Sequence, residues 1–63
     1  MNKLDSKMNE MMQTLISTAV DVEKFDQGNK SAGTRIRKAM QEIKNIAQEV
    51  RVEVQEIKNA VTA

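Results

Sequence analysis

The sequence predicts an all-α protein: an antiparallel hairpin of two helices that dimerises into a four-helix, coiled-coil-like bundle. Apolar residues recur at steps of four and three in both halves of the chain, which is the period of a helix and not of a strand. A Gln-Gly-Asn segment at residues 27–29 separates the two halves. Because a chain of 63 residues buries little apolar surface alone, we expect a second copy to complete the core.

The first helix is expected over residues 3–26. Its apolar stripe is spaced by fours and threes and consists of Leu4, Met8, Met11, Leu15, Thr18, Val22 and Phe25. Met12, Ile16 and Ala19 widen this stripe on one side. A stripe of this width predicts contacts with more than one neighbouring helix.

The turn is expected at residues 27–29 and the second helix over residues 30–61. Gly28 suits the position just past a helix end, where positive φ is needed, and Asn29 suits the N-cap of the next helix; Ser31 is a rival N-cap. The second apolar stripe comprises Ile36, Met40, Ile43, Ala47, Val50, Val54, Ile57 and Val61. A connection this short makes the helices antiparallel neighbours, so residues 1–63 are expected to form a single domain. Gly33 lies on the core phase of the second helix, where it would let two backbones, or a backbone and a ligand, come close.

Composition argues against an enzyme. The chain has no histidine and no cysteine, which removes the commonest general base, the thiolate nucleophile and the commonest metal ligands. We therefore expect no catalytic residues, metal, cofactor or small-molecule substrate. The apolar runs are too short to span a membrane and no signal peptide is evident, so the expected location is the cytoplasm.

Positive charge is concentrated in one segment. Residues 29–40 carry four bases and no acid, a balance of +4. Residues 1–28 have three bases against five acids, and residues 41–63 have three against four, giving −2 and −1. A net charge of +1 therefore conceals a local cluster that is suited to an anionic partner.

The cluster coincides with the expected start of the second helix, where free N–H groups and the helix dipole favour phosphate. Hydroxyls, bases and the cap residue there are the predicted DNA contacts: Asn29, Lys30, Ser31, Thr34, Arg35, Arg37 and Lys38. The alternative is that these bases pair with acids of the first helix, such as Asp21, Glu23 and Asp26.

A second set of bases is spaced by seven along the second helix. Arg37 begins this series, and Lys44, Arg51 and Lys58 are the candidates for secondary DNA contacts. Bases beside a core position more often form the salt bridges between helices of a coiled coil, and that interpretation is favoured here.

The segment GNKSAGTRIRKAM and the heptads that follow it resemble the bacterial histone-like proteins related to the chlamydial nucleoid-condensing protein. The resemblance covers residues 28–58 closely and the first helix loosely. It implies DNA binding and nucleoid organisation without catalysis, and its matching positions are Gly28, Asn29, Lys30, Arg35 and Arg37. The chlamydial members carry a long Lys/Ala-rich tail, and this chain is similar to the short, tailless form.

The predicted function is that of a histone-like, nucleoid-associated protein that binds the phosphate backbone of double-stranded DNA with little sequence specificity. Its expected partners are DNA and a second copy of itself. The alternative is a helical oligomerisation or adaptor module that binds an acidic protein partner, with the Met-rich stripe serving as a groove.

Overall fold

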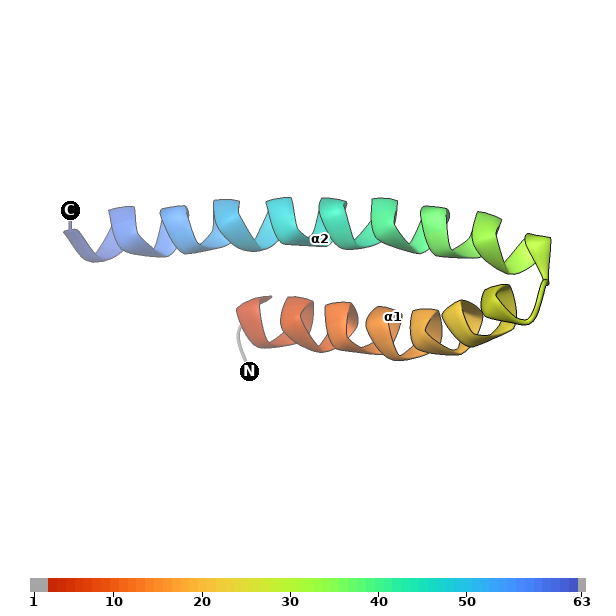
Figure 1. The fold of residues 1–63 in the computed structure, drawn as a ribbon. Helices are drawn as coiled ribbons and strands as arrows, with labels where there is room; N and C mark the ends of the chain where they lie inside the picture. Colours follow the sequence, from red (N-terminus) through yellow and green to blue (C-terminus); the bar gives the residue numbers. More distant parts are fainter. Residues whose placement is uncertain (1–2, 63) are drawn as a thin grey trace.

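The computed structural model describes the backbone of residues 3–62 and the side chains of residues 3–60. Two helices account for nearly all of this range, α1 over Lys3–Asp26 and α2 over Lys30–Thr62. They pack against each other as an antiparallel hairpin 53 Å long, and α2 continues past the start of α1 (Figure 1). This confirms the predicted all-α hairpin, and the helix bounds fall within one residue of the expected ranges.

The turn forms because the last carbonyls of α1 are satisfied by the residues that follow them. The N–H of Asn29 donates to the Lys24 carbonyl at 3.1 Å, and the N–H of Gly28 donates to the Phe25 carbonyl at 2.9 Å. This pair of bonds is the Schellman arrangement, and it places Gly28 at a φ of 97°. The side-chain Oδ1 of Asn29 then accepts a bond from the N–H of Ala32 at 3.3 Å. Asn29 is therefore the N-cap of α2, as expected, and its rival Ser31 lies inside the helix.

Gly28→Ala should destabilise the hairpin by about 1–2 kcal/mol, because a Cβ is strained at this left-handed φ. Urea unfolding followed by circular dichroism measures the loss. Gly28→Asn is the matched control and should lose less, since asparagine tolerates this region better. Equal losses for the two variants would contradict the argument from backbone strain.

The contact between the helices is narrow and partly polar. Only Ala32, Ile46 and Thr18 are buried among the described side chains. Thr18 is tolerated there because its hydroxyl donates to the Thr14 carbonyl at 2.7 Å. The inward-facing positions of α1 are thus shared by apolar and polar residues, and Lys7, Thr14 and Asp21 are all partly buried.

The hairpin consequently buries only part of each predicted apolar stripe. Leu4 and Met11 of α1 and Ile36, Ile43 and Val50 of α2 are partly buried in the hairpin. The remaining described members are mostly exposed, with Met8 at 47%, Leu15 at 49% and Phe25 at 51%. The side chain of Val61, which the sequence also placed in the stripe, lies outside the described residues. The stripes are therefore wider than the contact that one hairpin makes.

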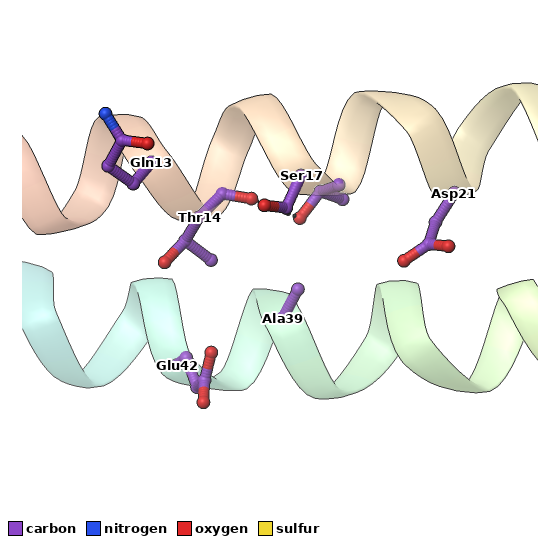
Figure 2. Close-up of a pocket in the computed structure, with 7 residues that line it drawn as sticks. Gln13, Thr14, Ser17, Asp21, Ala39 and Glu42 are labelled. Atoms are coloured by element: carbon purple, nitrogen blue, oxygen red, sulfur yellow. Dashed lines mark hydrogen bonds between the residues drawn. The ribbon is translucent and has the colours of Figure 1, made fainter.

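The two sides of the hairpin differ in character. One side has shallow polar hollows between the helices, lined by Gln13, Ser17 and Asp21 of α1 and by Glu42, Asn45 and Glu49 of α2. Figure 2 shows part of this side, with Asp21 and Glu42 at the groove. The other side carries the apolar face, which we define as Met8, Leu15 and Val22 of α1 with Met40, Ala47 and Val54 of α2. Each of these residues projects from the flank of its helix opposite to the polar hollows.

Candidate nucleic-acid interface

The predicted DNA contacts lie together at the closed end of the hairpin. We call residues 29–38 the basic turn. Six of its predicted contact residues are exposed in the first turns of α2: Lys30, Ser31, Thr34, Arg35, Arg37 and Lys38. The first turn of α2 contains no acidic residue. The free N–H groups and the positive end of the α2 dipole therefore face solvent with bases around them.

Arg35 differs from the other bases in being held by α1. Its Nε donates to Oδ1 of Asp21 at 2.9 Å, and the two side chains are 47% and 19% exposed. The predicted alternative, pairing with acids of the first helix, therefore applies to this arginine. Within residues 3–60, the side chains of Lys30, Arg37 and Lys38 make no ion pair, so these three charges remain available to an external anion.

A second ion pair joins the helices at the far end of the hairpin. Lys7 of α1 pairs with Glu49 of α2, and the hydrogen bond that Lys7 donates to this carboxylate raises the pKa of Lys7 above its ordinary value. The stabilisation is present at neutral pH and is lost as the pH rises through this elevated pKa. The pairs Lys7–Glu49 and Asp21–Arg35 also fix which residues of the two helices lie at the same height along the hairpin.

The bases spaced by seven do not face α1. Arg37, Lys44, Arg51 and Lys58 are all exposed, and they lie on the outer flank of α2, one turn beyond the apolar face. The charged residues of α2 that lie beside α1 are different ones. They include Glu49, which pairs with Lys7, and the partly buried Glu53. Among the described residues, Arg37, Lys44 and Arg51 therefore form none of the expected salt bridges with α1. Lys58 does take part in an interaction.

The sequence places Phe25 as a cap on the core near the turn, but sequence reasoning missed its contact with Gly33. Its ring packs on Gly33, where an added Cβ would lie 2.7 Å from Cε1, so within the hairpin it is this side chain, and not a backbone, that comes close to Gly33. Half of the ring remains exposed in a shallow hollow that it shares with Lys30 and Arg37. The spacing of eight residues between an aromatic and a glycine across a turn was the available signal.

The described residues form neither a metal site nor a membrane span. No group of acidic side chains there could hold a metal ion. Neither helix, over the part that the structure describes, is long and apolar enough to cross a membrane.

Comparison with known proteins agrees with the resemblance read from the sequence. The model of the family described as histone H1-like protein Hc1 matches residues 5–60, which include the turn and most of both helices. No curated protein and no solved structure gives a significant match. Membership of a histone H1-like family indicates a nucleoid DNA-binding protein with a structural and not a catalytic role. Because the match extends over most of the sequence, the chain belongs to the histone H1-like protein Hc1 family.

Proposed function

We propose that the protein binds double-stranded DNA through the basic turn, contacting the phosphate backbone with little sequence specificity. The observation that carries this proposal is a balance of +4 over residues 29–40, displayed at the closed end of a hairpin. A cluster of this sign without acids attracts phosphate by releasing counterions from DNA. By holding DNA in this way the protein would organise the nucleoid.

Each group in the basic turn has a part in phosphate binding. The guanidinium of Arg37 offers a planar fork that can grip two phosphate oxygens, while Lys30 and Lys38 act as point charges. The N–H groups of the first turn of α2 and the hydroxyls of Ser31 and Thr34 add donors. Asn29 contributes indirectly, because it holds α2 in the capped conformation that exposes these groups.

Low sequence specificity follows because the basic turn contacts phosphate groups and not bases. Phosphates are the same at every step of a duplex, so contacts to them position a protein without reading its sequence. Lys44 and Arg51 extend the exposed positive charge along α2, and with Lys58 they are candidates for secondary contacts with a duplex that lies along the helix.

A mobility-shift titration with duplexes of unrelated sequence tests the proposal. Affinities should agree between sequences and should fall with salt, with a log–log slope between about −3 and −5 for the three available bases of one basic turn or the six of two. Lys3→Ala, at the far end of the hairpin, is the matched control and should leave the affinity unchanged. Strong preference for one sequence, or binding that is indifferent to salt, would count against the phosphate contact.

Asp21→Asn should strengthen DNA binding. The substitution removes an acid near the turn and releases Arg35, which adds one further phosphate contact and makes the salt slope steeper by about 0.9. The same titration measures this change. In the Asp21→Asn background, Arg35→Ala should cancel the gain; a gain that persists would mean that Arg35 is not the group that reaches DNA.

We propose further that the working form is a homodimer. The chain exposes 5094 Å², whereas a compact monomer of 7.1 kDa would expose about 4,100 Å². The excess of about 1,000 Å² is comparable to the roughly 800 Å² that each partner buries in an ordinary stable interface. The apolar face supplies the surface for this contact.

Sedimentation at micromolar concentration should show a dimer whose melting temperature rises with protein concentration. Leu15→Gln, on the apolar face, should shift the equilibrium towards monomer. Val20→Gln is the matched control, because Val20 is also about half exposed but lies on a different flank of α1. A folded wild-type monomer at these concentrations would refute the proposed dimer.

A further inference from the structure

The apolar face has borders of opposite charge. Each α2 residue of the apolar face is followed four positions later by a base, and these bases are Lys44, Arg51 and Lys58. Arg37 continues this series towards the turn. The corresponding border of α1 consists of Asp5, Met12, Ala19 and Asp26, with two acids and no base. All eight residues are exposed, and Asp5 and Lys58 each also take part in an interaction within the chain. The surface that remains open for a second copy therefore has a basic edge on α2 and an acidic edge on α1.

Two hairpins can bring these faces together in two symmetric ways. If the two-fold axis runs parallel to the helices, each α2 lies against the second copy's α1, and the basic edge meets the acidic edge. If the axis runs across the helices, each α2 lies against the second copy's α2, and four bases meet four bases. The second arrangement sets like charges together, whereas the first sets the bases against acidic and uncharged residues.

The register within the hairpin strengthens this choice. Lys7 pairs with Glu49, so Asp5 lies level with Arg51 along the hairpin axis. An axis parallel to the helices keeps equal heights together, which sets Arg51 of one copy beside Asp5 of the other, and does so twice because of the symmetry. The register that symmetry imposes is thus the one in which these opposite charges meet.

We infer that the protein dimerises about an axis parallel to its helices, so that the apolar faces are joined and both basic turns lie at the same end of the bundle. This inference rests on the proposed homodimer and extends the proposed DNA contact. The dimer would present the six available bases of the two turns as one surface to one duplex, and the described residues at the opposite end form no comparable cluster. Such a particle coats or anchors DNA; it does not bridge two duplexes from its two ends.

The proximity of two positive turns works against this arrangement. Their charges are exposed, and salt at physiological concentration screens charges beyond about 8 Å. The border residues meet at closer range, where screening is weaker. Duplex DNA removes the repulsion between the turns, so DNA binding and dimerisation should strengthen each other.

Single cysteines test the orientation, since the natural chain has none. Gln27→Cys marks the turn and Ala60→Cys marks the far end, and both positions are exposed. Spin labels on a Gln27→Cys dimer should lie about 20–30 Å apart, given helix spacings of 8–10 Å. Copies labelled at 27 mixed with copies labelled at 60 should give a distance near the 53 Å length of the hairpin. The reverse pattern would overturn the inference.

A charge exchange provides an independent measurement. Arg51→Glu should raise the dissociation constant of the dimer about tenfold, and Asp5→Lys in the same chain should restore it by recreating the pair in the opposite sense. Failure of the rescue would reject the proposed pairing. Both experiments are made without DNA, so their failure is separate from failure of DNA binding, and a monomer in sedimentation would reject the homodimer itself.

Discussion

Replacing Lys30, Arg37 and Lys38 together by alanine should weaken duplex binding by on the order of a hundredfold or more. These three exposed bases make no ion pair within the described chain, so their charge is available to DNA. Each lost contact should also reduce the magnitude of the salt slope by about one unit. A mobility-shift titration at several salt concentrations measures both quantities on the same samples.

The fold should survive this change. All three side chains are exposed, and alanine favours a helix at each position. Circular dichroism should therefore give the wild-type helix content. The triple variant Lys3→Ala, Lys44→Ala and Lys58→Ala removes the same charge elsewhere and should bind considerably more tightly than the first variant. Equal binding by the two would show that total charge, and not the basic turn, determines affinity.

Ile46→Asp should unfold the protein. Ile46 is only 6% exposed and belongs to a core whose other buried described members are Ala32 and Thr18. An unpaired carboxylate in this position costs several kcal/mol, and the core of a domain this small supplies only about 3–5 kcal/mol. Circular dichroism at 25 °C should show that most of the helical signal is lost, together with DNA binding.

Val20→Asp is the matched control for this substitution. It introduces the same charge on a side chain that is 52% exposed and directed away from α2. Helix content and sedimentation should remain close to wild type. A folded Ile46→Asp protein would mean that the contact between α1 and α2 contributes little, and that the dimer interface holds the helices instead.

The sequence by itself determined the helices and the turn. Local rules suffice for these features: the steps of three and four define a helix, and Gly28 and Asn29 carry the positive φ and the cap that the turn requires. The location of the basic turn at the closed end of the hairpin follows from the same rules. The family resemblance rested on the same segment, and the family match confirms it.

Tertiary structure decided how the apolar stripes are used. Sequence spacing gives each helix an apolar side, but it cannot say which part of a wide stripe meets α1 or α2 and which part stays open. The angle at which the helices pack made that selection: Thr18 is buried, whereas Leu15 and Phe25 remain about half exposed. The tertiary structure also decided which charged side chains form ion pairs, because Asp21 can reach Arg35 only across the hairpin. The physical reason is that periodicity is a property of one helix, whereas burial and ion pairing depend on the position and rotation of two.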